Sequence, residues 1–477
     1  MQTQGAIGNL INRYRAVLKK CRLLNVFGSL AVAGLLVMGG AGVAGAAASR
    51  TEVQADTQLV TDYIGIETTG PTQDSTVNGK DYGFGGALSI RNKNVSTFTI
   101  DGVNFISNKI SGVTSTGNYG GGLYTDANIE IKNSRFEGNT VEATNDSYGG
   151  AIGATSGGKL TIVDTDFIGN EQLGGNTDGD GGGAIFGANS VTVNIIGGLF
   201  EGNTANGFGG AIKANGNLDV NGSVFTGNYA QLYGGAISTD DTTQTAIISN
   251  VTATGNSTDG EGGAIWHGAK DGVSMVFTGK NEFSGNTDAA GDNDIFNASN
   301  IEIAEGTTDF QSGYKQGNNH WTNATPSLAV TDDAQMAAKS MTLDKGSVTV
   351  EVGGALGNGT DIAGLQAALA EAAANGVDTS GGAYVGKTSL DLASASLGVG
   401  QAASGTPGDV TFAPGSALLA DQTALAGDAA FTGVSTADVT DAQVHVQNAV
   451  AGQSLTLFEG VDDGTGTGTK TQPTVNG

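Results

Sequence analysis

The sequence predicts an all-β protein whose chain winds into a right-handed parallel β-helix. Glycine makes up 80 of the 477 residues and proline only 5, which excludes collagen-like chains. A tetrapeptide of the type Gly-Gly-Ala-Ile recurs every 25–35 residues, and a second phrase, typically Phe-x-Gly-Asn, lies between its copies. Stretches with alternating apolar residues precede each asparagine and predict strands with one buried face. Units this short bury an apolar face only by stacking as successive coils.

The repeat residues are predicted to form the architecture. The aliphatic residue of each tetrapeptide and the aromatic residue of each second phrase are expected to line the interior as two columns, while the glycines allow close approach at a corner and the asparagines form a ladder at a turn. The tetrapeptides begin at Gly85, Gly120, Gly149, Gly182, Gly209, Gly234 and Gly262. The second phrases supply Phe105, Phe136, Phe167, Phe200, Phe225 and Phe283, with Ala253 interrupting the column, and Asn108, Asn139, Asn170, Asn203, Asn228, Asn256 and Asn286.

Residues 1–48 have the composition of an extended secretory signal peptide, with predicted cleavage after Ala48. They contain five basic residues and no acidic residue, followed by an apolar run that ends in small residues. The alternative is a transmembrane helix, but four glycines at positions 39, 40, 42 and 45 interrupt the run. Cys21 would leave with this segment, so the mature chain is expected to contain no disulfide.

The excess of acidic residues restricts the kinds of partner that the chain can bind. The chain has 47 acidic and 21 basic residues and a net charge of −26. Such a surface repels phosphate groups and anionic lipids, so nucleic acid is excluded as a partner.

The domain organisation follows the density of the repeats. Residues 49–80 are expected to form an N-terminal capping segment, residues 81–300 the β-helix with the repeats, and residues 301–477 further coils with weaker motifs. The alanine-rich segment 361–376 is predicted to form a surface helix that projects from a turn, with Asp361 as its N-cap and Gly376 at its end.

The paired motifs resemble those of the polymorphic outer-membrane proteins of chlamydiae and of related autotransporter passengers. The resemblance covers residues 85–286, and the phrase DNDIF at 292–296 is similar to the one that replaces the next tetrapeptide at the end of such arrays. It implies a pectin-lyase-like β-helix, exposed at the cell surface and used in adhesion. Autotransporters end in a membrane β-barrel, whereas this sequence ends in TGTGTKTQPTVNG. The expectation is a truncated or partial sequence, and the alternative is that the translocator lies on another chain.

Catalysis, cofactors and bound metals are not expected. Polysaccharide-cleaving β-helices need carboxylates gathered on neighbouring coils, and no alignment of these coils on the phenylalanines stacks two or three of them. His267, His320 and His445 are far apart in the sequence and have no Ser or Cys partner motif nearby. The segment NTDGDG at 176–181 is weakly similar to a calcium loop, but Gly187 stands where a bidentate Glu is needed, and a solvated turn is the preferred interpretation.

A contact surface is the better functional candidate. The residue after each inward aliphatic residue must point out of the coil, which places Tyr124, Phe186 and Trp266 on one sheet. If exposed, these rings are suited to bind a sugar or a protein; the alternative is that long loops between the repeats cover them.

The sequence therefore predicts a secreted passenger displayed at the outer membrane. Its expected role is adhesion to a host or neighbouring-cell protein or glycan, or self-association. A carbohydrate-active enzyme and a structural stalk remain the alternatives.

Overall fold

The computed structural model describes residues 51–53, 58–59, 63–64, 67–69, 83–91, 97–113, 117–143, 146–156, 158–174, 180–240, 245–268, 274–318, 325–439, 441–459 and 475–476. Residues 1–48 form a separate unit and lie outside the described residues, together with the predicted signal peptide and its cleavage site at Ala48.

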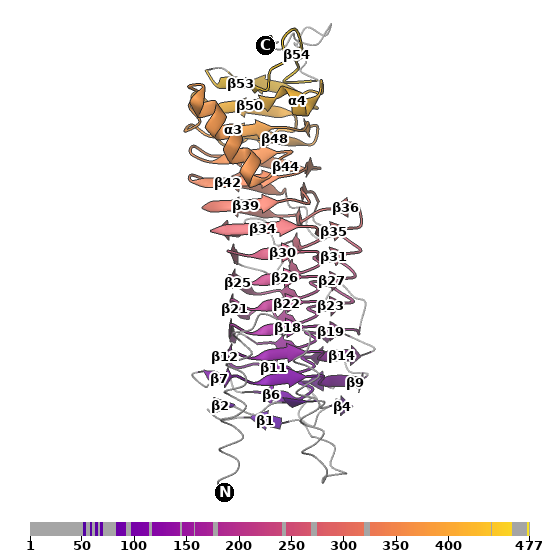
Figure 1. The fold of residues 1–477 in the computed structure, drawn as a ribbon. Coiled ribbons are helices and arrows are strands. Elements are labelled where there is room, and N and C mark those ends of the chain that lie inside the picture. Colours follow the sequence, from indigo (N-terminus) through magenta and orange to yellow (C-terminus); the bar gives the residue numbers. More distant parts are fainter. Residues whose placement is uncertain are drawn as a thin grey trace. The chain divides into compact units, whose positions relative to one another are not determined.

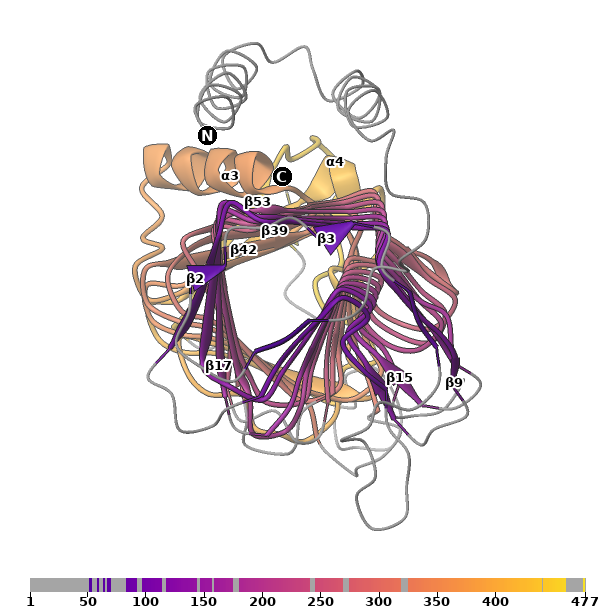
Figure 2. The ribbon, with the colours of Figure 1, turned by 90° about the horizontal axis from the view of Figure 1, so that it is seen from below.

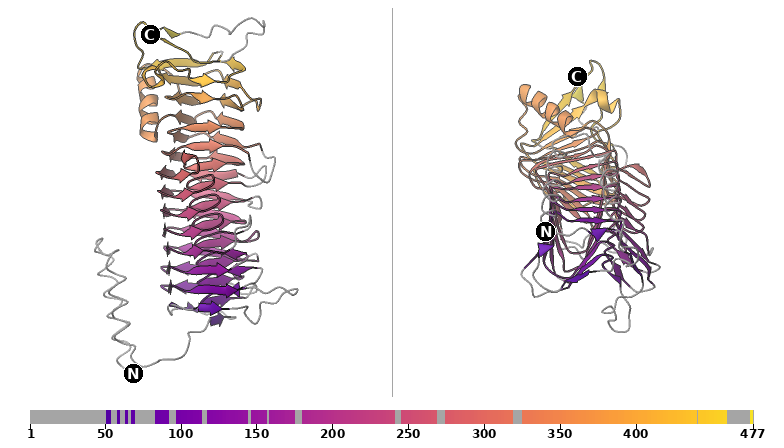
Figure 3. Two further views of the ribbon diagram at one scale, coloured as in Figure 1. Left: turned by 90° about the vertical axis from the view of Figure 1, so that its right-hand side faces the viewer. Right: turned by 60° about the horizontal axis from the view of Figure 1, so that its bottom comes forward.

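The unit that begins at Ser49 is a parallel β-solenoid, which confirms the predicted fold class. Its coils follow one another in chain order from the indigo to the yellow end of Figure 1. The coils as far as β43 cross three long sheets, here named A, B and C, the later coils continue sheets B and C, and most of the earlier coils add a strand to a side sheet, D. Figure 3 shows the same stacking from two further directions. Strands pair in parallel in all four sheets except at the end of sheet D.

Sheet A contains 11 described strands. They are β1 (Thr51–Val53), β6 (Leu88–Ile90), β11 (Leu123–Thr125), β16 (Ile152–Ala154), β20 (Ile185–Gly187), β24 (Ile212–Ala214), β28 (Ile237–Thr239), β32 (Ile265–His267), β37 (Ile295–Asn297), β40 (Tyr314–Gln316) and β43 (Met341–Leu343).

Sheet B contains 14 described strands. They are β2 (Gln58–Leu59), β7 (Phe98–Asp101), β12 (Ile129–Lys132), β17 (Lys159–Val163), β21 (Thr192–Ile196), β25 (Asn217–Asn221), β29 (Ala246–Ser249), β33 (Ser274–Thr278), β38 (Asn300–Ile303), β41 (Ser327–Val330), β44 (Gly346–Val350), β48 (Ala395–Val399), β49 (Asp409–Phe412) and β52 (Thr436–Asp438).

Sheet C also contains 14 described strands. They are β3 (Tyr63–Ile64), β8 (Asn104–Ile106), β13 (Arg135–Glu137), β18 (Asp166–Ile168), β22 (Leu199–Glu201), β26 (Val224–Thr226), β30 (Thr252–Thr254), β34 (Lys280–Ser284), β39 (Gly306–Phe310), β42 (Ala334–Ala338), β45 (Ala355–Asn358), β46 (Ala383–Gly386), β50 (Ala417–Asp421) and β53 (Gln443–Gln447).

Sheet D lies beside the solenoid and ends in an antiparallel hairpin (Figure 2). Its described strands are β4 (Glu67–Thr69), β9 (Lys109–Val113), β14 (Thr140–Ala143), β19 (Glu171–Gln172), β23 (Thr204–Ala205), β27 (Tyr229–Ala230), β31 (Ser257–Thr258), β35 (Thr287–Asp288) and β36 (Gly291–Asp292). Smaller sheets pair β5 (Gly83–Phe84), β10 (Asn118–Tyr119) and β15 (Ser147–Tyr148), then β47 (Leu390–Asp391) with β51 (Phe431–Thr432), and β54 (Ser454–Leu455) with β55 (Val475–Asn476).

The apolar core fills the space enclosed by sheets A, B and C. The aliphatic residues of the repeat tetrapeptides are register partners on successive strands of sheet A and are all buried: Leu88, Leu123, Ile152, Ile185, Ile212, Ile237 and Ile265. The paired glycines make the corner before this column. Gly182 has a φ of +75°, and a Cβ on it would meet the carbonyl oxygen of Ile185 at 2.2 Å, so a larger residue does not fit there.

The strands among residues 49–80 belong to the solenoid itself, because β1, β2, β3 and β4 pair with the next strands of sheets A, B, C and D. The region after residue 300 continues sheets B and C to β52 and β53. Helix α3 (Ile362–Ala374) starts at the predicted N-cap Asp361, whose carboxylate accepts the Gly364 N–H, and Gly376 follows it with positive φ.

The expectation that this helix projects from the solenoid is wrong. Leu365, Ala368 and Ala372 are buried in a cluster with apolar residues on the outer face of sheet C. Figure 2 shows α3 and the short helix α4 (Gln422–Leu425) outside that sheet. Small and aliphatic residues of the sheet, such as Ala337 and Val385, accept the helix closely.

Candidate functional site

The aromatic column runs through the interior behind sheet C. Phe105, Phe136, Phe167, Phe200 and Phe225 are fully buried and lie on register partners of successive coils. Their neighbouring rings stack at centroid distances of 4.4, 5.0, 4.8 and 4.7 Å. Such rings contribute to stability through burial and through ring contacts. Phe283 resumes the column after Ala253 and meets Phe310 at 5.1 Å.

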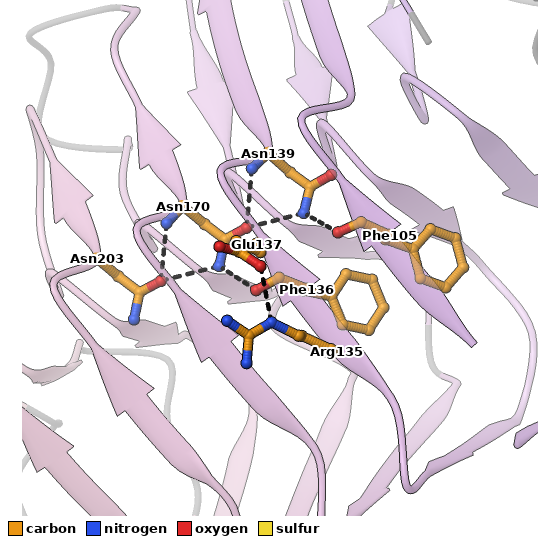
Figure 4. A network of polar contacts seen from close by, with 7 residues as sticks. All are labelled: Phe105, Arg135, Phe136, Glu137, Asn139, Asn170 and Asn203. Atoms are coloured by element: carbon orange, nitrogen blue, oxygen red, sulfur yellow. Dashed lines mark hydrogen bonds and ion pairs between the residues drawn. The ribbon is translucent and has the colours of Figure 1, made fainter. Parts of the chain in front are cut away.

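The asparagine ladder lies at the turn after sheet C. The side-chain amide of Asn170 donates to Oδ1 of Asn203 at 2.9 Å and to the carbonyl oxygen of Phe136 at 3.0 Å (Figure 4). Its own Oδ1 accepts the backbone and side-chain N–H groups of Asn139 at 3.0 and 2.9 Å. The same side-chain bond links each neighbouring pair in the series Asn108, Asn139, Asn170, Asn203, Asn228, Asn256 and Asn286. Every one of these asparagines is fully buried, so the ladder satisfies the polar groups of the turn without water.

The ladder ends at Asp294, within the DNDIF phrase. Asn286 donates its side-chain N–H to Oδ1 of Asp294 at 2.7 Å, and the backbone N–H of Ser312 donates to Oδ2 at 2.6 Å. Ile295 is the register partner of Ile265, so this phrase takes the place of the next tetrapeptide. The Asp294 side chain is fully buried, and desolvation raises the pKa of its carboxyl to about 6 although these hydrogen bonds oppose the shift.

The outer face of sheet A does not expose the predicted contact residues. Tyr124, Phe186 and Trp266 are only 3%, 4% and 0% exposed, so the prediction of an exposed aromatic surface is wrong. They do lie beside inward aliphatic residues on sheet A, but the chain returning from sheet D covers them, as in the alternative interpretation.

The cover over sheet A is aromatic. Tyr148 stacks on Tyr119 at 4.7 Å and meets Phe186 at 4.5 Å, and burial raises the pKa of Tyr148. Tyr233 lies 5.4 Å from Trp266. The sequence contains a signal for this cover, since an aromatic residue directly precedes most of the glycine pairs, at Phe84, Tyr119, Tyr148, Phe208 and Tyr233.

A buried lysine lies under the same cover. Lys213 is 1% exposed, and its ammonium group lies 4.2 Å from the centroid of the Phe208 ring and 4.0 Å from a carboxylate oxygen of Asp240. The ring face and the carboxylate offset part of the cost of burying the charge. This lysine therefore contributes to the packing of the cover.

The described histidines lie in different strands, His267 in β32 and His445 in β53. Among the described residues, no group of three or more His, Cys, Asp or Glu side chains could hold a metal ion. His267 is buried and contacts Thr239, while His445 lies 4.0 Å from Glu371 and His320 lies outside the described residues. Most of the segment 176–181 also lies outside them; its Asp180 is buried and accepts the Ser147 N–H at 3.0 Å.

One stretch of the chain resembles a known protein. The chain is similar to an autotransporter. Over 82 residues, 17% of this chain, it is 34% identical to the protein named "Probable autotransporter YfaL" of Escherichia coli (strain K12). The matched stretch spans 7% of the length of that relative. No protein-family model and no solved structure matches the chain. In the described part of the chain, neither helix combines the length and the apolar composition that crossing a bilayer requires.

Proposed function

We propose that this chain is the secreted passenger of an autotransporter-type protein, displayed at the outer membrane, and that it acts in adhesion or self-association without catalysis. The supporting observation is the long parallel β-solenoid together with its local similarity to an autotransporter. The solenoid presents the outer faces of sheets B and C along many coils, and extended repeat surfaces of this kind suit contact with large partners.

The proposed partners are a protein or a glycan on a host or neighbouring cell, or a second copy of the chain. The repeat residues are buried in the interior columns and the ladder. Contact with a partner therefore depends on outward side chains and on loops. The chain's net charge of −26 disfavours nucleic acid and anionic membranes as partners.

The test is display on a bacterial surface. The chain is fused in front of an autotransporter translocator barrel in a non-adherent strain, and the control strain carries the barrel alone. The expected result is protease-accessible chain on intact cells, together with increased binding to epithelial cells or faster settling of the culture. Display without a gain in either assay would contradict the adhesive role. Release of reducing ends from polysaccharides by the purified chain would favour an enzyme instead.

A further inference from the structure

The outer faces of sheets B and C contain four aliphatic side chains at their shared corner, here named the aliphatic patch: Val163, Ile196, Leu199 and Val224. We propose that this patch binds a basic polypeptide partner through apolar side chains flanked by lysine or arginine. The inference rests on the proposed adhesive function, and it names one surface and one class of partner for it.

The patch is continuous across the corner between sheets B and C. Val163 and Ile196 are register partners in sheet B, and Leu199 and Val224 are register partners in sheet C. Only Gly197 and Gly198 separate Ile196 from Leu199 along the chain, and the Asp164 carboxylate lies against Gly197 at this corner. Ile196 is 44% exposed and Val224 is 39% exposed.

A second aliphatic pair, Ile247 and Val276, lies farther along sheet B. Asp219 and Asn221 of the intervening strand β25 separate this pair from the patch. Grouped aliphatic side chains in water differ from single exposed ones, because a partner that covers several of them gains free energy in proportion to the buried apolar area.

The charges around the patch are mainly negative. Asp164, Asp166, Glu201 and Asp219 lie on or beside its strands. The neighbouring cations are Lys159, near Asp219, Lys132, the register partner of Val163, and Arg135, the register partner of Asp166.

Two of these cations already have partners. Lys132 pairs with Glu130 at 3.3 Å and Arg135 with Glu137 at 2.7 Å. A negative excess therefore remains around the patch. A basic partner complements it, whereas a second copy in the same register would set carboxylates against carboxylates.

In the later coils, a helix packs on the outer face of sheet C. Helix α3 packs Leu365, Ala368 and Ala372 on the sheet, and its own segment supplies this cover. In the patch, Ile196 and Val224 remain partly exposed, so no described element covers them completely. The outer face at the patch is therefore suited to bind the apolar side of another polypeptide, as the later coils bind α3.

The experiment measures binding of a synthetic amphipathic peptide of leucine and lysine to the purified full chain. We expect the double variant Ile196→Ser, Val224→Ser to weaken binding by about tenfold or more, since both substitutions remove apolar contact and leave the charge unchanged. The control Val352→Ser changes an aliphatic residue that is 58% exposed outside the patch, and it should leave the affinity unchanged. The variant Asp219→Asn, Glu201→Gln should reduce the salt dependence of binding.

Equal affinity of the wild-type chain and the Ser double variant would overturn the inference, because attraction would then depend on net charge alone. Self-association in sedimentation that the Ser double variant abolishes would also overturn it, by making a second copy the occupant. In the display assay, undiminished adherence of the Ser double variant would contradict a role of the patch in adhesion but would leave the proposed adhesive function in place. Absence of adherence by the wild-type chain would instead contradict the proposed function.

Discussion

The coils before Asp294 and the coils after it are stabilised by different contacts. From residue 85 to 297, each turn is fixed by a buried asparagine that bonds to its neighbours in the adjacent coils, and a side sheet covers sheet A. After residue 298 the described coils have no strand in sheet D. Their core is mainly aliphatic, with Leu328, Val348 and Leu397 as examples, and α3 covers the outer face of sheet C.

The difference teaches that a β-solenoid is specified either by identical residues in ladders or by a plain apolar pattern. The ladder fixes the turn after sheet C, so the loops elsewhere vary in length and the repeat spacing ranges from 25 to 35 residues. The later coils use different polar residues at their turns, such as the buried Asn358, which donates to the Thr388 carbonyl oxygen at 3.1 Å.

The largest expected effect comes from breaking the aromatic column. Phe167→Ala removes a ring that stacks on both sides and leaves a cavity, so we expect the free energy of unfolding to fall by about 3–5 kcal/mol. Chemical denaturation measures this loss. The column is interrupted at Ala253, and on the next coil Phe277 meets Phe283 at 6.0 Å. A loss below about 1 kcal/mol for Phe167→Ala would contradict the role of the column.

The next effect comes from breaking the ladder. Asn170→Ala leaves the buried backbone N–H of Asn139 without its partner and removes the side-chain bonds to Asn203 and Phe136, and we expect a loss of about 2–4 kcal/mol. Asn358→Ala in the later coils should cost less, because the Asn358 side chain is not part of a ladder. The exposed Asn189 provides a control, and Asn189→Ala should leave the denaturation midpoint unchanged. Equal losses at the three positions would remove the distinction between the two regions.

The junction is expected to respond to pH. The pKa of Asp294 is raised from 3.8 in the reference state to about 6 in the folded chain, so the folded state binds this proton more tightly. Its contribution therefore makes the chain more stable as the pH falls from 7 to 4, by at most about 3 kcal/mol. Asp294→Asn should remove this increase. Denaturation at several pH values tests it, and an unchanged pH profile in the variant would contradict the assignment.

The smallest effect concerns α3. Asp361→Ala removes the hydrogen bond to the Gly364 N–H, which measures 2.7 Å, and N-caps contribute about 1 kcal/mol. We expect a small loss of helical signal and a slightly lower denaturation midpoint, with the repeat coils unaffected. Asp378→Ala, at an exposed aspartate beyond the helix, serves as the comparison for a general loss of negative charge.

Much of the fold could be predicted because the repeat residues recur at the same position in successive coils. Register follows from aligning Phe136 with Phe167, and the cap and end of α3 follow from Asp361 and Gly376. The burial of Tyr124, Phe186 and Trp266 could not be read from alternation, since alternation says only which way a side chain points. What covers it depends on how sheet D folds back, and the aromatic residues before the glycine pairs are meaningful only once that return path is known. The packing of α3 depends likewise on small residues of sheet C that lie far from it in sequence.

Hydrogen exchange measured by mass spectrometry on the wild-type chain and on Asn170→Ala tests the central claim most directly, namely that the ladder joins the repeat coils into one unit that ends at Asp294. We predict faster exchange in the coils from Asn108 to Asn286 and unchanged exchange in residues 325–439. Faster exchange confined to the coil of Asn170, or spread equally through the later coils, would contradict it.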